Sequence, residues 1–444
     1  MEGSGASMKS PFRSLLLLST PVVLGNIAAA ANELVNRYVL GQVSEAALAA
    51  SLPGSMLALV FTGVFTNTIG YATALIAKAR GAGDEALERR TFVQALWLTA
   101  ATVPFFALVV PIGIIALQTI GHAPDVLRNE IVYFSFSALG GLLSVNTTAL
   151  GTYHAGRGKT AVPAAAALAG CLTDIIATPL LVLVANLGIT GAGLGKSCGL
   201  LVTVLILAFF VLRDLSRLPP ISGLSAFERT TAIRLLKLGF PFGLSSVVGS
   251  GTFTVFVMCL GACGAEVLAV GNICFALNNL FNTMLTGVET AIVIAIGNCK
   301  GADDANGARR FFYAGLRLAL LALAVCYGPV LSVSDGLVTF FLGNAVTDQV
   351  LSLARFFLFT LFIGGLFETV KHISTGALRS TGHTTYIFTT HLIVSGGLWM
   401  PATIALTTAH NPRLLLLATA LYTALHALVL SRRIPKALQL RNKD

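Results

Sequence analysis

Apolar stretches long enough to cross a lipid bilayer follow one another along almost the whole chain. A helix needs about 20 apolar residues to span the bilayer core, where no water is available for unpaired backbone groups. Only helices and closed barrels meet that condition, and these stretches lack the alternation of polar and apolar residues found in barrel strands. The sequence therefore predicts an all-α integral membrane protein.

The proportion of charged residues supports this class. Charged residues make up 11% of the chain and hydrophobic residues 55%, whereas a soluble domain carries roughly 25% charged residues. We expect about twelve transmembrane helices, near residues 11–40, 52–78, 91–117, 127–152, 160–186, 190–212, 233–260, 268–298, 308–333, 350–378, 384–408 and 412–431.

The chain also repeats itself. A shift of 220 positions aligns Pro21 with Pro241, Gly41 with Gly261, and the basic pair after helix 2 with Arg309. Such a repeat in an apolar chain is typical of transporters built from two lobes. We expect an expression tag at 1–7, an N-lobe of six helices at 8–212, a cytoplasmic linker at 213–232, a C-lobe of six helices at 233–431 and a cytoplasmic tail at 432–444. Because six spans separate equivalent positions, the lobes should share one orientation and be related by an axis along the membrane normal.

The net charge of +10 is explained by topology. Most Lys and Arg residues fall in alternate loops and at the termini, which predicts that both termini are cytoplasmic. We therefore expect no nucleic-acid partner. The sequence contains no P-loop, dinucleotide fingerprint or HExxH motif, so we expect neither an enzyme nor a cofactor. An ion gradient would have to drive any transport.

Charged residues inside predicted spans cost roughly 2.5–3.5 kcal/mol each on insertion scales, so each needs an explanation. The N-lobe holds one polar set, made of Glu33, Asn36, Asp174, Thr178 and Lys196. Glu33 could simply pair with Arg37 one turn away. Asp174 has no charged neighbour at that spacing, so it should face a partner helix or a cavity. Lys196 could be the counter-ion of one of these carboxylates.

The C-lobe holds the second polar set, made of Asn278, Asn282, Thr286, Glu289, Glu368, Lys371 and His372. The first four lie on one helix face at steps of four, four and three residues. Carboxylate, amide and hydroxyl oxygens are ligands that suit Na+, and a desolvated carboxylate could instead bind H+. Glu368 could alternatively pair within its helix with Lys371 or His372. The sequence leaves both alternatives open.

Prolines lie inside the first and seventh predicted helices at matched positions. A proline within a helix removes one backbone hydrogen bond and favours a kink. Pro21 and Pro241 are therefore predicted hinges of two corresponding moving parts.

Several of these features resemble the MATE (multidrug and toxic compound extrusion) family, in particular its NorM and DinF branches. The resemblance rests on the duplication and on Pro21, the segments Leu34–Gly41, Arg80–Asp84 and Gly376–Arg379. It covers essentially the whole chain. It implies two homologous six-helix bundles around a V-shaped cavity, and cation-driven antiport.

The chain departs from the family pattern in the N-lobe. The family has Asp in helix 1 at the position of Asn36, and Asn and Asp in helix 5 at the positions of Asp174 and Thr178. Lys196 replaces a small or hydroxyl residue and could occupy the space of a bound cation. In helices 1 and 5 the carboxylate is thus displaced by one turn, to Glu33 and to Asp174.

In the C-lobe, Glu368 falls on the helix-10 carboxylate of NorM-type members. Their helix-7 Glu is absent, since Gly249 lies near its place, and Glu289 could substitute for it. These departures leave the location of the cation site open, with a slight preference for the C-lobe.

We therefore expect a monomeric antiporter in the bacterial inner membrane, surrounded by membrane lipid. It would export a small organic substrate, such as a drug or a toxin precursor, by alternating access in exchange for Na+ or H+. The alternatives are a lipid-linked flippase, a major-facilitator-type carrier and, more remotely, a membrane-embedded transferase.

Overall fold

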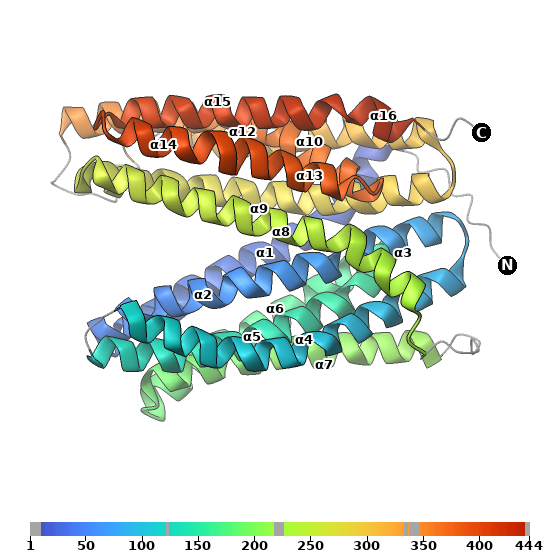
Figure 1. The fold of residues 1–444 in the computed structure, drawn as a ribbon, viewed down its shortest axis with the longest axis horizontal. Helices are drawn as coiled ribbons and strands as arrows, with labels where there is room; N and C mark the ends of the chain where they lie inside the picture. The colour runs from blue at the N-terminus through green and yellow to red at the C-terminus, as the bar shows by residue number, and fades with distance from the viewer. Residues whose placement is uncertain are drawn as a thin grey trace. The chain divides into compact units, whose positions relative to one another are not determined.

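The computed structural model describes residues 10–120, 124–216, 226–332, 336, 339 and 347–439, and for 45–57, 120 and 265 it describes the backbone only. In the part described, regular structure is entirely helical (Figure 1). The elements are α1 (Pro11–Gly41), α2 (Glu45–Gly70), α3 (Ala72–Gly81), α4 (Glu85–Ile120), α5 (Pro124–Gly156), α6 (Ala161–Pro179), η1 (Leu180–Val184), α7 (Gly188–Ser216), α8 (Arg229–Ala262), α9 (Ala265–Gly301), α10 (Ala305–Ser332), α12 (Asp348–Ser380), α13 (Thr384–Thr390), η3 (His391–Trp399), α14 (Met400–Thr407), α15 (Pro412–Arg432) and α16 (Ile434–Leu438).

Among the described residues, 12 helical spans are long and apolar enough to cross a membrane. They coincide with the predicted helices and confirm the predicted fold class. Several spans extend beyond the predicted ends. For example, the third span is Glu85–Thr119 and begins before the predicted residue 91. The sequence did not indicate this start, because the first two turns are polar and carry no hydrophobic signal.

The chain divides into two compact units. Unit 2 is Leu24–Gly243, and unit 1 combines Met1–Val23 with Leu244–Asp444. Each boundary thus falls inside a helix, α1 or α8, and not in the linker predicted to separate the lobes. The predicted tag and parts of the predicted linker and tail lie outside the described residues.

Each of the two boundaries between the units lies two residues after a proline inside a helix. The prolines are Pro21 in α1 and Pro241 in α8. Proline interrupts the backbone hydrogen bonding of a helix, which allows the segments before and after it to follow different neighbours. Glycines permit close packing of the segments before these boundaries. A Cβ at Gly287 would lie 2.4 Å from Val23 Cγ2 in unit 1, and one at Gly239 would lie 2.2 Å from the Thr68 carbonyl oxygen in unit 2.

Helices of unit 2 pack in a pattern that unit 1 repeats. In unit 2, α5 contacts α2, α4 and α7, and α6 packs along α7. In unit 1, α12 contacts α9, α10 and α15, and the segments η3 and α14 pack along α15. The sequence duplication is therefore also a duplication of helix packing.

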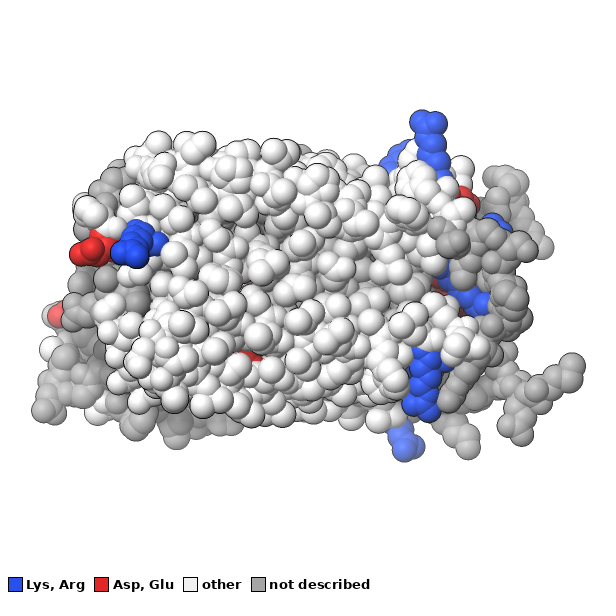
Figure 2. All heavy atoms as spheres, turned by 90° about the horizontal axis from the view of Figure 1, so that it is seen from below, with Lys and Arg blue, Asp and Glu red and all other residues white. Residues whose placement is uncertain are grey.

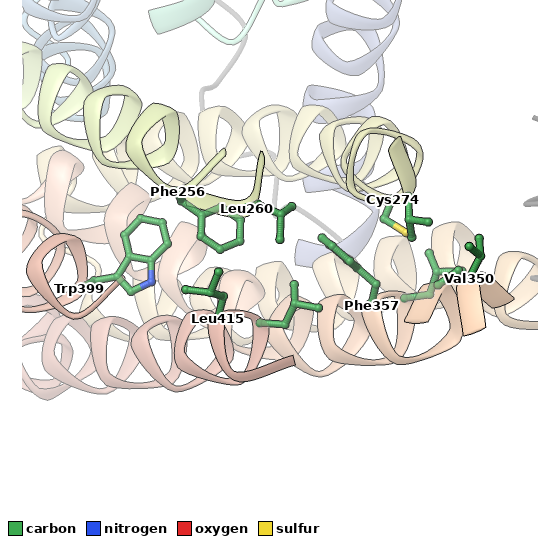
Figure 3. Close-up of a cluster of buried hydrophobic side chains, with 11 residues drawn as sticks. Phe256, Leu260, Cys274, Val350, Phe357, Trp399 and Leu415 are labelled. Atoms are coloured by element: carbon green, nitrogen blue, oxygen red, sulfur yellow. The ribbon is translucent and has the colours of Figure 1, made fainter. Parts of the chain in front are cut away.

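Unit 1 contains a large aromatic and aliphatic core (Figure 3). Phe256 of α8 lies with its ring centroid 5.5 Å from that of Trp399 in η3, and Phe357 of α12 and Leu415 of α15 complete the contact between helices. These side chains fix the helices that carry the polar residues described below.

Exposed apolar side chains cover the outer surface. On α6, Leu172 is 60% and Ile176 is 62% exposed, and the two are one turn apart on the same face. Asp174 lies between them in sequence and therefore on the opposite face, where it is buried. Figure 2 shows one molecular face with most of its charged side chains near two ends, and between them a broad band with a single small acidic spot. Such a band is what a lipid-facing surface requires.

Candidate ion-coupling sites

A buried acid of unit 2 is held by hydrogen bonds from neutral side chains. Asp174 of α6 is 2% exposed. Its Oδ2 accepts hydrogen bonds from Asn32 Nδ2 at 2.6 Å and Asn36 Nδ2 at 3.0 Å, and its Oδ1 accepts one from Thr178 Oγ1 at 2.6 Å. Among the described residues no Lys, Arg or His forms an ion pair with it. Hydrogen-bond donors directed at a carboxylate stabilise its ionised form without neutralising its charge.

Small residues on α7 make room for this arrangement. A Cβ at Gly195 would lie 2.1 Å from Thr178 Oγ1, and one at Gly199 would lie 2.9 Å from Asp174 Cβ. These glycines bring the backbone of α7 directly against the face of α6 that carries both polar residues. Close approach through small residues is typical of packing between membrane helices.

A second acid of unit 2 is ion-paired. Glu33 Oε2 lies 3.1 Å from Lys196 Nζ on α7, and its Oε1 lies 3.8 Å from Arg37 Nε one turn along α1. Both of the anticipated partners of Glu33 are therefore present. The contact with Lys196 is the shorter and joins two helices. Roughly one third of each side chain is exposed, 36% for Glu33 and 33% for Lys196.

The predicted N-lobe set omits Asn32, which makes the shortest hydrogen bond from α1 to Asp174. Its spacing of four residues from Asn36 places both amides on one face and is the signal that could have identified it. The Oδ1 atoms of both amides are buried and have no hydrogen-bond partner within the described residues. Two further oxygen atoms at this site are thus unused.

In unit 1, Glu289 of α9 is enclosed by cationic and imidazole groups. Its Oε2 lies 2.8 Å from His372 Nδ1, and its Oε1 accepts a hydrogen bond from Arg379 Nη1 at 3.1 Å. The Glu289 side chain is only 9% exposed. His372 and Arg379 lie seven residues apart on α12, and both contact Glu289, so they share the face that meets α9.

Glu368 pairs within its own helix. Its Oε2 lies 2.5 Å from Lys371 Nζ and 3.7 Å from His372 Nε2. His372 therefore lies between the carboxylates of Glu289 and Glu368. With Lys371 beside Glu368 and Arg379 beside Glu289, each acid has a basic side chain of its own.

The polar stripe predicted near Glu289 makes other contacts. Asn282 Nδ2 donates to the Asn278 carbonyl oxygen at 2.9 Å, and Thr286 Oγ1 donates to the Asn282 carbonyl oxygen at 2.9 Å. Asn278 Oδ1 accepts a hydrogen bond from Tyr327 of α10 at 3.0 Å. The structure thus brings His372 and Arg379 to Glu289, in place of the amide and hydroxyl oxygens expected there.

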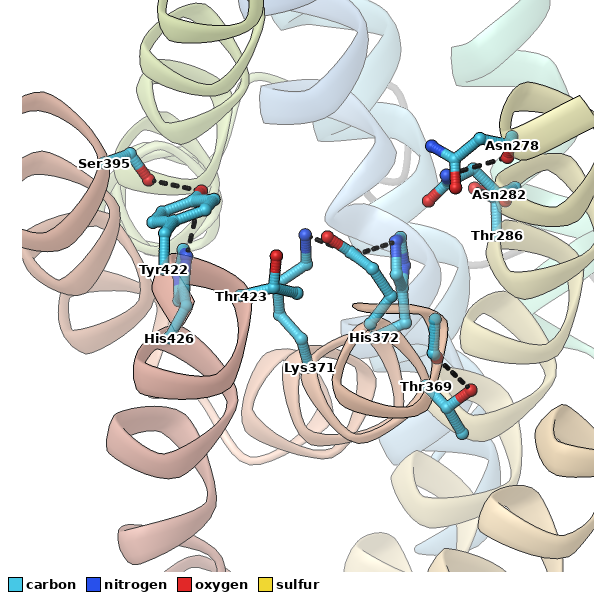
Figure 4. A network of polar contacts seen from close by, with 12 residues as sticks. Asn278, Asn282, Thr286, Thr369, Lys371, His372, Ser395, Tyr422, Thr423 and His426 are labelled. Carbon is cyan, nitrogen blue, oxygen red and sulfur yellow. Dashed lines mark hydrogen bonds and ion pairs between the residues drawn. The ribbon is translucent and has the colours of Figure 1, made fainter. Parts of the chain in front are cut away.

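The sequence pattern marks Arg379 only as the end of the segment Gly376–Arg379, which resembles the MATE family. In the structure it lies within the last turn of α12 and reaches a carboxylate 90 residues away in sequence. A further polar cluster lies on η3 and α15, where Tyr422 OH lies 2.8 Å from Ser395 Oγ and 3.3 Å from His426 Nδ1 (Figure 4). Neither feature has a local sequence signal.

The sequence model of the MatE family matches residues 21–180 and 241–404. The chain belongs to the MATE family of transporters. The two matched segments begin at Pro21 and Pro241, so both repeats carry the family pattern from the same position. This MATE protein is a multi-pass membrane transporter and not an enzyme. The major-facilitator and transferase alternatives are thereby excluded.

Curated relatives of this MATE transporter resemble it along most of their length. The probable multidrug resistance protein NorM of Xanthomonas campestris pv. campestris is 26% identical over 401 residues, which cover 88% of this chain and 86% of that protein. The multidrug resistance protein PmpM of Pseudomonas aeruginosa is 25% identical over 328 residues, covering 71% of this chain and 67% of that protein.

Solved structures share the fold. A MOP superfamily transporter from Pyrococcus furiosus is 15% identical and superposes with a TM-score of 0.86 over 97% of both chains. A MATE protein crystallised in complex with MaL6 is 16% identical and gives a TM-score of 0.86 over 96% of this chain and 97% of its own. At this identity the likeness establishes the MATE fold.

Proposed function

We propose that this MATE transporter exports small organic compounds across the bacterial inner membrane in exchange for a monovalent cation, and that the cation binds at Asp174. The names of the relatives NorM and PmpM, both described as multidrug resistance proteins, support the substrate class. The observation that carries the proposal is the set of three neutral hydrogen-bond donors around a buried carboxylate that has no basic partner in the described part of unit 2.

Charge balance favours Asp174 over the acids of unit 1. A coupling acid must gain and lose a cation during each cycle. Glu289 and Glu368 already have Arg379 and Lys371 at 3.1 Å and 2.5 Å, so another cation would have to displace a covalently attached one. Asp174 forms no ion pair within the described residues, so a cation could bind there without displacing a basic side chain. This preference replaces the slight preference for the C-lobe drawn from the family resemblance.

The contacts of Asp174 provide a route from cation binding to movement. Asn32 and Asn36 lie on α1, whereas Asp174 lies on α6, so two charge-assisted hydrogen bonds tie these helices together. A cation bound to the carboxylate removes its charge, and hydrogen bonds to a neutral acceptor are weaker than those to an ionised one. Cation binding should therefore loosen the attachment of α1 to α6.

The two prolines supply matched points of bending. α1 belongs to unit 1 as far as Val23 and to unit 2 from Leu24. A change in the hydrogen bonds between its second segment and Asp174 would be transmitted along the same helix into unit 1. Pro21 would be the hinge, and Pro241 is its counterpart in α8. Alternating access then exposes the substrate site to one side of the membrane at a time. We keep the expectations of a monomer and of cytoplasmic termini.

The decisive experiment replaces Asp174 with asparagine in purified transporter reconstituted into liposomes. Asp174→Asn preserves the shape and one acceptor oxygen but removes the charge. We expect efflux of a fluorescent organic cation, driven by an imposed pH or sodium gradient, to fall by about tenfold or more, because the coupling free energy is lost. Exchange down the substrate's own gradient should persist.

The matched control is Asp125→Asn, which removes an exposed acid at the start of α5 and should leave efflux unchanged. Gradient-driven efflux that survives Asp174→Asn would overturn the assignment of the coupling acid. A lipid-linked flippase remains the alternative substrate class. Transport of a fluorescent lipid-linked sugar, with no transport of small organic compounds, would establish it.

A further inference from the structure

Lys196 is the unusual member of the unit 2 site. It projects from α7 and places its ammonium nitrogen 3.1 Å from Glu33 Oε2 on α1. It follows Gly195 directly, and Gly195 is in contact distance of Thr178 beside Asp174. The ammonium group thus joins α7 to α1, the helix whose Asn32 and Asn36 contact Asp174. Intramembrane Lys is costly and is retained where it serves a function.

We infer that Lys196 is a tethered counter-ion that takes the place of a bound sodium ion in unit 2, so that the coupling ion of this transporter is the proton. The inference rests on the proposed role of Asp174 and deepens it by naming the ion. Lys196 acts here as a residue that determines ion specificity, through its charge and its position.

The charge count of the site supports exclusion of sodium. Glu33 and Asp174 contribute two negative charges, and Lys196 and Arg37 two positive charges. The contact that a sodium ion would make with a carboxylate is already made by the Lys196 ammonium group. A sodium ion that binds the Glu33 carboxylate would therefore have to displace that ammonium group.

The donors around Asp174 also favour a proton. Sodium requires several oxygen atoms directed at one point, whereas both oxygens of Asp174 face N–H or O–H groups. The unused Oδ1 atoms of Asn32 and Asn36 would have to rotate toward the ion, at the cost of both existing hydrogen bonds. A proton needs a single lone pair. The resulting neutral acid can itself donate a hydrogen bond, for example to one of those Oδ1 atoms.

A simpler role for Lys196 is a structural tie between α7 and α1. The two roles differ in what happens when the ammonium group is removed. A structural tie predicts only lower stability. A tethered counter-ion predicts that the site, now carrying one net negative charge, gains affinity for sodium.

The test measures the melting temperature of the purified full-length transporter in NaCl and in choline chloride at equal ionic strength. We expect no sodium-specific shift for the unchanged protein or for Lys196→Arg, which keeps the charge. Lys196→Met should gain a saturable stabilisation of about 2 °C by sodium, since a ligand that binds only the folded state raises the melting temperature. Lys196→Thr, which adds a hydroxyl ligand, serves as the second variant if Lys196→Met does not fold.

The same variants should differ in transport. A pH gradient should drive efflux by the unchanged protein and a sodium gradient should not, whereas in Lys196→Met a sodium gradient should accelerate efflux several-fold. The double variant Lys196→Met with Asp174→Asn should lose the sodium effects. Sodium-specific stabilisation of the unchanged protein, or folded Lys196 variants with no sodium response, would overturn the inference. The proposed role of Asp174 is tested separately. It fails if the single variant Asp174→Asn keeps its pH-driven efflux, whatever the sodium response of the Lys196 variants.

Discussion

The two halves of this duplicated transporter pack their helices alike, but the acids at their candidate ion-coupling sites have different partners. In unit 1, Glu289 and Glu368 are paired with Arg379 and Lys371. In unit 2, Asp174 is held by two amides and a hydroxyl. A buried ion pair is fixed, because removing either charge leaves the other uncompensated. A carboxylate held by neutral donors can change its charge. Under the proposed function, unit 1 would provide a rigid frame and unit 2 the cation-binding element.

The difference also shows how a duplicated transporter can specialise. Corresponding helices α5 and α12 occupy the same central position in their units, yet the charges of the unit 1 site lie on α9 and α12 and those of the unit 2 site on α1, α6 and α7. The hydrogen bonds to Asp174 come from α1, a helix that is shared between the units. A change of charge there can alter α1 directly.

The largest expected effect comes from breaking the ion pair between Glu289 and Arg379 in unit 1. Arg379→Met leaves the Glu289 carboxylate, 9% exposed, with His372 as its remaining charge partner. Removing one member of a buried pair costs about 3–5 kcal/mol, and we expect a loss of this order in the free energy of unfolding in detergent micelles. Asp174→Asn should cost less, because it leaves no unpaired charge.

The double variant Glu289→Gln with Arg379→Met controls for lost packing and should recover part of the stability. If Arg379→Met proves as stable as the unchanged protein, Glu289 is not the fixed acid described here. If Asp174→Asn lowers the free energy of unfolding more than Arg379→Met does, the roles proposed for the two units, rigid frame and cation-binding element, are reversed.

An intermediate effect concerns the two prolines. Pro21→Ala and Pro241→Ala restore a backbone hydrogen bond, so neither should lower the melting temperature. Both should slow gradient-driven efflux, Pro21→Ala several-fold and Pro241→Ala less, because only α1 carries the amides that contact Asp174. Equal slowing by the two substitutions would show that the hinges act symmetrically and that the contacts of α1 add nothing.

Much of the fold could be predicted from the sequence, because long apolar runs and a gap-free repeat are properties of the chain itself. The unit boundaries could not be predicted, since a proline marks a weak point in a helix without indicating which neighbours each side will choose. At the sites, the isolation of Asp174 from charged neighbours predicted that it faces a partner helix or a cavity, and in the structure it contacts Asn32 and Asn36 of α1. The pairing of Glu289 with Arg379 joins residues 90 positions apart, and nothing local to either residue encodes it.

A smaller difference between the units lies at the helix ends outside the membrane spans. Gly158 and Gly382 both adopt positive φ, 76° and 84°, in corresponding turns. The residue that follows is Lys159 in unit 2, which pairs with Asp214 at 3.0 Å, and His383 in unit 1. Histidine is the side chain whose charge ordinarily changes between pH 5 and 8.

Burial, followed by the nearby cations Arg433, Lys300 and Lys436, holds the pKa of His383 below its usual range. As the pH falls through about 6.5, the unfolded chain takes up the proton before the folded protein does. The stability contribution is therefore complete above that pH and decreases below it. His383→Gln should flatten the fall in melting temperature between about pH 7 and pH 5.5, whereas Lys159→Gln should leave the slope unchanged. An unchanged slope in His383→Gln would place the acid sensitivity elsewhere, and the difference between these two turns would then have no effect on stability.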